Sequence, residues 1–185
     1  MEARIRHKYE LKNTCGYGVN SLVDYDDPVD ILMHLMIGSE GTLGFISEVT
    51  FETVPDLKLK ASALLYFPSI REACKSILPL RECSVSAAEL MDRNALRAVE
   101  NEPGMPETLR TLPDEAVALL IDTSANDEQT LQKQFAEIEE KLSSVQTLYP
   151  VSFTTDPGLY ATYWRVRSGL FTSAAAGRPR GTVPL

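Results

Sequence analysis

The heptapeptide AVALLID, Ala116 to Asp122, decides the fold that we predict for this chain. A short apolar run bounded by polar residues is typical of a strand that is buried in a sheet. Further elements can be assigned outward from it in both directions. Before it we predict a strand at 61–67, a helix at 69–83, a strand at 85–91 and a short helix at 92–100; after it we predict a helix at 126–145 and a strand at 147–155.

Apart from the short helix, the order of these elements is strand, helix, strand, strand, helix, strand. This is the order of a ferredoxin-like fold, so we predict an α+β domain with an antiparallel sheet and helices. The helix at 126–145 carries an apolar stripe at Leu131, Phe135, Ile138 and Leu142. The stretch 101–112 contains proline and glycine, and we expect it to be too polar for the core.

The first part of the chain has a different pattern, and we expect a domain boundary between residues 1–58 and 59–185. A helix is predicted at 2–11 and a loop at 13–27. Asp27-Pro28 then opens a second helix, with Asp27 as its N-cap. The alternation from Phe45 to Val54 predicts a strand that ends at Pro55.

A glycine-rich stretch, MIGSEGTLGFISEVTF, lies between that helix and that strand. Its glycines recur at every third position, Gly38, Gly41 and Gly44. Glycine has no Cβ, so such a loop can bring its main chain against a flat or bulky ligand. The spacing is neither G-x-G-x-x-G nor a P-loop, which argues against a nicotinamide cofactor or a nucleoside triphosphate. A tight helix-to-strand turn without a ligand explains the glycines equally well.

The segment GSEGTLGFISEVTF, together with KNTCGYGVNSL from Lys12 to Leu22, resembles FAD-linked oxidases of the vanillyl-alcohol oxidase and p-cresol methylhydroxylase type. The nearest branch is that of the D-lactate and D-2-hydroxyglutarate dehydrogenases. The resemblance implies that residues 1–58 are the C-terminal part of an FAD-binding domain, and that 59–185 are a truncated C-terminal substrate or cap domain. It implies FAD contacts at Asn13, Gly38, Ser39, Glu40, Gly41, Thr42, Gly44 and Ile46.

A helix predicted from Asp156 to about Ala174 carries the second candidate site, Arg167. On a helical wheel Arg167 lies amid the side chains of Tyr160, Tyr163, Trp164, Leu170 and Phe171. A guanidinium in such a place can stack on a ring, extend past the apolar face, or bind a carboxylate with two parallel donors.

Trp164-Arg-Val-Arg167 is similar to the Trp-x-x-Arg of the dehydrogenase branch, whose arginine binds the substrate carboxylate. The resemblance therefore gives the substrate-binding role to Arg167, whereas Arg165 points to solvent. Relatives specific for hydroxyglutarate have threonine four residues later, where this chain has Phe171. This difference leaves the identity of the acid open.

Charge and composition limit the partners. The chain has 185 residues, a net charge of −8 and a pI of about 4.8, which argues against nucleic acid and against an anionic membrane surface. No apolar run is long enough for a transmembrane helix. Residues 156–185 are locally cationic, which suits either a small anion or a solvated tail with scattered arginines. The three cysteines show no metal-binding or disulfide pattern, and they predict free thiols, no metal site and a cytoplasmic location. Peripheral membrane association of the full-length enzyme and a homo-oligomer are open alternatives.

The function that we predict is part of an FAD-dependent dehydrogenase, which oxidises a D-2-hydroxy acid such as D-lactate or D-2-hydroxyglutarate by hydride transfer to flavin. In the family the catalytic base lies beyond the position of Leu185, so we expect a middle fragment that is inactive and holds little FAD by itself. The electron acceptor is unknown, and an iron–sulfur cluster of larger relatives would lie outside these residues. The alternative is a non-catalytic ferredoxin-like module that binds a metabolite or another protein.

Overall fold

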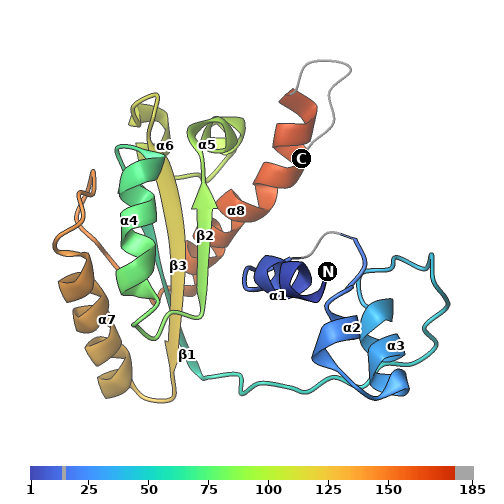
Figure 1. Ribbon diagram of the computed structural model, residues 1–185. Helices are drawn as coiled ribbons and strands as arrows, with labels where there is room; N and C mark the ends of the chain where they lie inside the picture. The colour runs from blue at the N-terminus through green and yellow to red at the C-terminus, as the bar shows by residue number, and fades with distance from the viewer. Residues whose placement is uncertain (14–15, 178–185) are drawn as a thin grey trace. The chain divides into compact units, whose positions relative to one another are not determined.

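The computed structural model describes the backbone of residues 1–13 and 16–177 and the side chains up to residue 168 (Figure 1). The chain divides into two units, Met1–Val54 and Pro55–Leu185. The described part of the first unit contains three helices, α1 (Glu2–Tyr9), α2 (Ser21–Asp24) and α3 (Pro28–Met36). The second unit contains the sheet and the other described helices. Within the described residues, no helix has the length and apolar character needed to cross a membrane.

In the described part of the second unit, the sheet has three antiparallel strands with β3 (Val117–Ala125) in the middle. β1 (Leu59–Phe67) pairs along its whole length with β3, and β2 (Ala87–Met91) pairs with the other edge of β3. The run that begins at Ala116 therefore forms the central strand, and its residues up to Ile121 are at most 1% exposed. The predicted antiparallel α+β architecture is confirmed.

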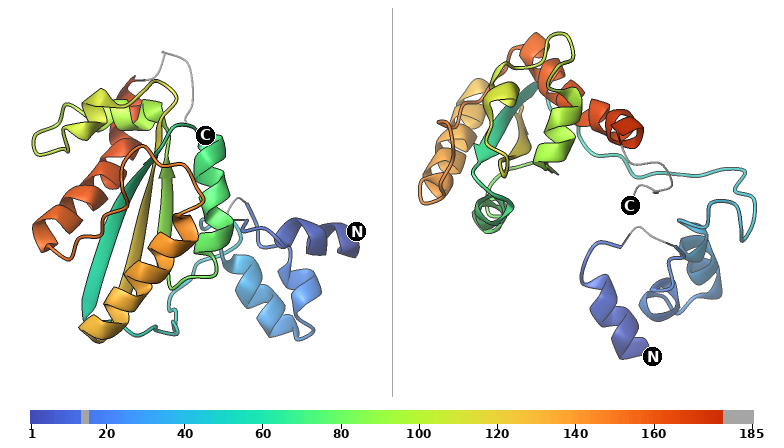
Figure 2. Two further views of the ribbon diagram at one scale, coloured as in Figure 1. Left: turned by 90° about the vertical axis from the view of Figure 1, so that its left-hand side faces the viewer. Right: turned by 90° about the horizontal axis from the view of Figure 1, so that it is seen from above.

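Helices cover both faces of this sheet, as the two views of Figure 2 show. One face packs against α4 (Ile70–Leu80) and α7 (Glu128–Leu142) through a core that includes Phe67, Leu119 and Ile138. The other face packs against α5 (Arg93–Val99), α6 (Thr108–Thr111) and α8 (Pro157–Gly177). Successive strand residues point to opposite faces, so both faces of β3 are apolar because both are covered.

Side-chain caps begin several of these helices where the sequence predicts them. The Asp27 carboxylate accepts hydrogen bonds from the backbone N–H groups of Val29 and Asp30. At the start of α8, the Asp156 carboxylate accepts the N–H of Leu159 at 2.8 Å. Further caps are provided by Ser69, Asp92 and Asp127. Each cap satisfies donors that a helix leaves unpaired at its N-terminus.

The predicted strand at 147–155 is wrong, because only one bridge forms, between Ser62 and Thr154. Continued pairing from that bridge would put position 150 opposite Tyr66. Position 150 is a proline, which has no N–H to donate, and the Tyr66 carbonyl instead accepts the N–H of Leu148 at 2.7 Å. The segment therefore follows the outer edge of β1 with two residues too many for a regular ladder.

The predicted strand from Phe45 to Val54 is also wrong. This stretch is irregular, and Phe45, Phe51 and Val54 are 92%, 80% and 86% exposed. The alternating pattern is present, but no strand of the described chain pairs with it, and a strand needs a neighbour to satisfy its backbone. The loop predicted at 13–27 contains the short helix α2.

The excursion at 101–112 contributes to the core, contrary to the prediction. Met105, Leu109 and Leu112 are all less than 9% exposed and belong to the cluster beneath α5 and α8. The short helix α6 turns Leu109 inward and leaves its polar neighbours outside. Three apolar residues that face the sheet are therefore enough to bury part of this segment, although most of its residues are polar.

Candidate functional site

The glycine-rich segment forms two consecutive turns after α3. Gly38 and Gly41 have φ of +78°, and Glu40 between them has φ of +50°. The N–H of Ser39 donates to the Met36 carbonyl at 3.1 Å, and the N–H of Thr42 donates to the Ser39 carbonyl at 3.0 Å. These bonds fix the backbone in a left-handed conformation that residues with a Cβ adopt reluctantly.

A threonine and a tyrosine brace the same loop. Thr42 Oγ1 donates to the Ser39 carbonyl at 2.6 Å and lies 2.9 Å from the hydroxyl of Tyr17. Ser39 is 3% exposed. Tyr17 belongs to Lys12–Leu22, the first of the two segments that resemble the FAD-linked oxidases, and Thr42 belongs to the second. The contact between Tyr17 and Thr42 therefore links these two segments within one unit.

Gly38, Gly41 and Gly44 differ in the space that is available for a side chain, which can be tested by adding a Cβ atom at each position. At Gly38 it would lie 2.9 Å from the Gly16 carbonyl oxygen, and at Gly44 it would lie 2.9 Å from the Met36 methyl carbon. At Gly41 nothing lies within 4 Å. Internal packing therefore favours glycine at Gly38 and Gly44, whereas at Gly41 the positive φ alone favours it. The space beside the main chain of Gly41 is open within the described residues.

The other residues with an implied FAD role all lie in the same unit. Asn13 is half-buried and follows α1 in irregular backbone. Glu40 is exposed, and Ile46 is 48% exposed in the irregular stretch after Gly44. The turns bring together the residues from Gly38 to Thr42.

The second candidate site, in the unit Pro55–Leu185, is built around a buried carboxylate that the sequence analysis missed. Asp122 of β3 is 7% exposed, and its Oδ2 accepts the Tyr160 hydroxyl at 2.7 Å and the Trp164 Nε1–H at 3.0 Å. Its Oδ1 accepts the hydroxyl of Ser62 on β1. Among the described side chains, no cation pairs with Asp122, so neutral donors alone compensate its burial.

This carboxylate changes the chemistry of the tyrosine that contacts it. Burial and then the hydrogen bond with Asp122 raise the pKa of Tyr160 to about 12, because both disfavour the phenolate. The signal in the sequence was the aspartate at the end of an otherwise apolar strand. Alternation places it on the face of Ala118 and Leu120, toward α8.

Arg167 lies on the same helix, one turn beyond Trp164. Its Nε is 3.4 Å from Oε2 of Glu89 on β2, and the two side chains are 47% and 39% exposed. Among the described residues, its two outer nitrogens make no hydrogen bond. Tyr160 and Trp164, two of the rings expected near Arg167, contact Asp122 on the sheet face that also carries Glu89, whereas Val166 is the residue of this turn that is fully buried. The side chains of Leu170 and Phe171 lie outside the described residues.

Arg165 points elsewhere. Its Nη2 lies over the backbone of Gly104, where a Cβ would meet it at 2.7 Å. Arg165 is exposed, as predicted. The two arginines of the Trp-Arg-Val-Arg motif therefore have different neighbours. Arg165 lies against the backbone of Gly104, and Arg167 faces the carboxylate of Glu89 on the sheet.

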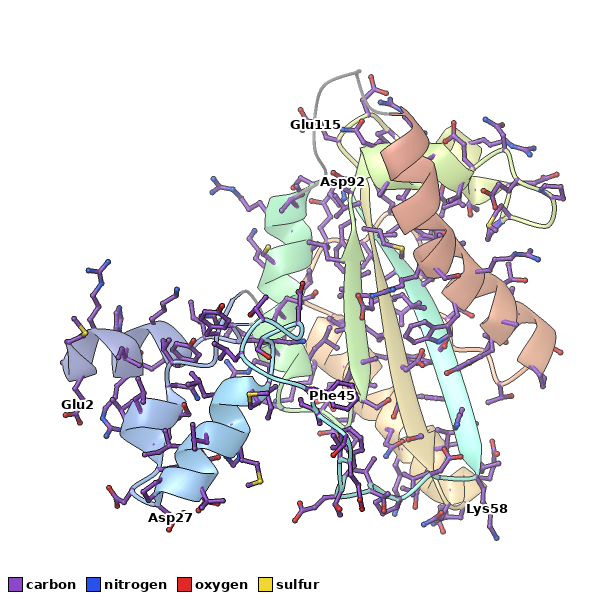
Figure 3. All side chains as sticks on the ribbon, turned by 90° about the vertical axis from the view of Figure 1, so that its right-hand side faces the viewer. Glu2, Asp27, Phe45, Lys58, Asp92 and Glu115 are labelled. Atoms are coloured by element: carbon purple, nitrogen blue, oxygen red, sulfur yellow. The ribbon has the colours of Figure 1, made fainter. Side chains whose placement is uncertain are left out.

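The sheet register explains why Glu89 and Asp122 face the same helix. Ala87 pairs with Asp122 and Glu89 pairs with Leu120, so the side chains of both acids lie on the α8 face. α8 lies beside the sheet in Figure 3. Tyr160, Trp164 and Arg167 are spaced along α8 by four and three residues, and all three contact these acids. Among the described side chains, no group of three or more potential ligands could hold a metal ion.

Sequence comparisons match this chain to known proteins. The family model described as FAD linked oxidases, C-terminal domain, matches residues 57–185. The mitochondrial D-lactate dehydrogenase [cytochrome] of Kluyveromyces lactis is 28% identical over 170 residues, which are 90% of this chain and 27% of that protein. Its Arabidopsis thaliana counterpart is 25% identical over 92% of this chain and 28% of its own length.

A second Arabidopsis thaliana protein, the mitochondrial D-2-hydroxyglutarate dehydrogenase, is 27% identical over 75% of this chain and 25% of its own length. The chain thus spans less than a third of the length of these curated relatives.

Proposed function

Because this chain belongs to the FAD-linked oxidases through their C-terminal domain, we propose that it is the middle portion of a flavin-dependent dehydrogenase of D-2-hydroxy acids. The similarity to D-lactate and D-2-hydroxyglutarate dehydrogenases supports this proposal. Its substrate would be a small anionic 2-hydroxy acid, and its location a reducing compartment such as the cytoplasm. The free thiols of Cys74 and Cys83 are compatible with that location.

In this proposal residues 1–58 complete an FAD-binding domain and residues 59–185 form the substrate domain. The exposed apolar side chains of Phe45, Phe51 and Val54 support the first assignment, because the rest of such a domain would bury them. The sheet order β1-β3-β2, with Thr154 bridged to the outer edge of β1, supports a ferredoxin-like second domain.

The cofactor would lie against the glycine turns, with the open main chain at Gly41 as its closest support. When bound, FAD supplies the acceptor for the hydride that leaves the α-carbon of the substrate. Glu40 and Thr42 would hold the turns in shape, and the residues of this chain would take no proton. The base that accepts the hydroxyl proton is proposed to lie beyond Leu185.

Arg167 would bind the substrate carboxylate. Its Nε pairs weakly with Glu89, and its outer nitrogens make no hydrogen bond with the described residues, so they can present two parallel N–H donors to a carboxylate. Such a contact fixes the orientation of the α-carbon, which is the contribution that positioning makes to the rate. The observation that carries the proposal is that Arg167 faces the sheet beside Glu89 and that its outer nitrogens make no hydrogen bond with the described residues.

Separate substitutions of Arg167 and Arg165 test whether Arg167 binds the substrate carboxylate. In the complete flavoenzyme, assayed with D-lactate and D-2-hydroxyglutarate and a dye as electron acceptor, Arg167→Ala should lower kcat/KM by about 10- to 100-fold, because charged hydrogen bonds to the carboxylate are lost. Arg165→Ala should leave it within about twofold, since loss of an exposed charge has a small effect. Equal losses in the two variants would contradict the assignment.

A non-catalytic ferredoxin-like binding module is the second candidate. It is favoured by the self-contained core of the unit Pro55–Leu185, which has apolar clusters on both faces of its sheet. A protein extended at both ends distinguishes the two. A yellow protein bleached by D-lactate or D-2-hydroxyglutarate supports the dehydrogenase, and a colourless one supports the module.

A further inference from the structure

We propose that Tyr17 is a positioning residue for FAD, and that it acts by holding the turn from Ser39 to Thr42 in shape. In that shape the backbone N–H groups of Glu40 and Gly41 are free to bind the cofactor. The inference rests on the proposed function, in which FAD lies against the glycine turns. It adds a residue from outside the glycine-rich stretch, and it names the main-chain donors that this residue keeps available.

The turn from Ser39 to Thr42 needs support because its backbone is unusual. Both central residues have positive φ, +50° at Glu40 and +78° at Gly41, as in a type I′ turn. Glycine adopts such angles freely, but a residue with a Cβ does so at a cost that the surrounding contacts must offset. Among the described residues, the N–H groups of Glu40 and Gly41 make no hydrogen bond. They are therefore the donors that this exposed turn offers to a ligand.

The direction of the hydrogen bond between Tyr17 and Thr42 follows from counting hydrogens. Thr42 Oγ1 lies 2.6 Å from the Ser39 carbonyl oxygen, which can only accept, so the threonine hydroxyl donates its single hydrogen there. The Tyr17 hydroxyl, 2.9 Å from Oγ1, must then be the donor to Thr42. The Ser39 carbonyl also accepts the N–H of Thr42 at 3.0 Å. Tyr17 therefore fixes the rotamer of the side chain that closes the turn.

Tyr17 is itself held by residues outside the turn. Its carbonyl accepts the hydroxyl of Tyr9 on α1 at 3.1 Å and the N–H of Val19 at 2.8 Å. The next residue, Gly18, packs closely on the end of α3, because a Cβ there would lie 3.0 Å from the His34 carbonyl oxygen. Tyr17 thus links the turn to α1 and α3. Its side chain is 45% exposed, so removal of the hydroxyl opens no cavity in a core.

The experiment measures the dissociation constant of FAD in the complete flavoenzyme, by titrating the apo form and following flavin fluorescence. Tyr17→Phe keeps the ring and removes the donor, so it should raise the dissociation constant about 2- to 10-fold, the factor that one neutral hydrogen bond contributes. Tyr25→Phe is the matched control in the same unit and should leave the constant unchanged. The Tyr25 ring stacks on His34, and its hydroxyl makes no hydrogen bond with the described residues.

Substitutions of Thr42 test whether Tyr17 acts through it. Thr42→Ser keeps the hydroxyl and should retain most of the affinity for FAD, whereas Thr42→Val keeps the shape, removes the hydroxyl and should weaken binding at least as much as Tyr17→Phe. Because Thr42→Val removes the acceptor of the Tyr17 hydroxyl, the double variant should bind FAD no more weakly than Thr42→Val alone. Such non-additivity is the signature of two residues that share one interaction.

Weaker binding in Tyr17→Phe but not in Tyr25→Phe, with no further loss in the double variant, supports the inference. Unchanged affinity in Tyr17→Phe, additive losses in the double variant, or equal losses in Thr42→Ser and Thr42→Val overturn the role of Tyr17 and leave the dehydrogenase proposal standing. A complete protein that binds no FAD overturns both. Thermal unfolding of the apo forms is the second measurement, and a lower midpoint in Tyr17→Phe than in Tyr25→Phe would assign Tyr17 to the stability of the unit instead.

Discussion

Removal of one hydroxyl should test whether Asp122 anchors α8 to the sheet. In Tyr160→Phe the ring remains, but Asp122 Oδ2 loses the donor that lies 2.7 Å away and keeps only Trp164 Nε1–H. Hydrogen bonds to charged groups contribute about 1.5–3 kcal/mol. Since Tyr160 is only half-buried, water can replace part of that bond, and we expect a loss near the lower limit, about 1.5 kcal/mol.

The assay is urea unfolding followed by fluorescence. The chain has a single tryptophan, Trp164, so its emission reports on α8 and the unit that contains it. With an m-value of about 1–3 kcal/mol/M, the expected loss lowers the midpoint by about 0.5–1.5 M. The fluorescence emission of folded Tyr160→Phe should also shift, because Asp122 Oδ2 accepts hydrogen bonds from both Tyr160 and the Trp164 indole, and the variant removes one of them.

Tyr149→Phe is the control. Tyr149 is 40% exposed, and its hydroxyl makes no hydrogen bond with the described residues, so its removal should change stability by less than about 0.5 kcal/mol. If Tyr160→Phe is no less stable than Tyr149→Phe, the contacts of Asp122 do not hold α8 in place. The reasoning about the buried carboxylate would then be refuted.

Three further predictions follow from the structure. The pKa of Tyr160 is raised to about 12 in the fold, so the stability that its protonated hydroxyl contributes is complete below pH 10 and is lost as pH rises toward 12. Between pH 10 and 12 the free energy of unfolding should therefore fall more steeply in the native chain than in Tyr160→Phe. Leu109→Ala should lower the free energy of unfolding by about 2–5 kcal/mol in urea titrations, since Leu109 is fully buried; a loss below about 1 kcal/mol would contradict its place in the core. Gly41→Val should abolish FAD retention in the complete enzyme, measured by flavin absorbance, whereas Gly16→Val, at another left-handed glycine with open surroundings, should retain it.

Local signals in the sequence predicted most elements of the second unit. The apolar run at Ala116 marks the central strand, and the stripe that includes Leu131 and Ile138 marks the buried side of α7. Asp27 and Asp156 mark helix starts because a cap is a contact between residues two or three positions apart. Such features depend on near neighbours, so the sequence can reveal them.

Features that depend on distant partners escaped prediction. Asp122 meets Ser62, Tyr160 and Trp164, which lie 60, 38 and 42 positions away in the sequence. The ion pair of Arg167 with Glu89 likewise joins a helix to a strand far earlier in the chain. The helical wheel placed Arg167 correctly on α8, but it could not show which turn of that helix enters the core.

The segment that follows the outer edge of β1 has a consequence for self-association. Its two attachment points, Leu148 to Tyr66 and Thr154 to Ser62, occupy backbone groups that a strand from another molecule would need. Pro150 between them offers no donor, so the segment is itself a poor template for a further strand. Intermolecular strand addition is thereby blocked on this side, and within the described sheet only the short strand β2 remains as an edge through which copies could join.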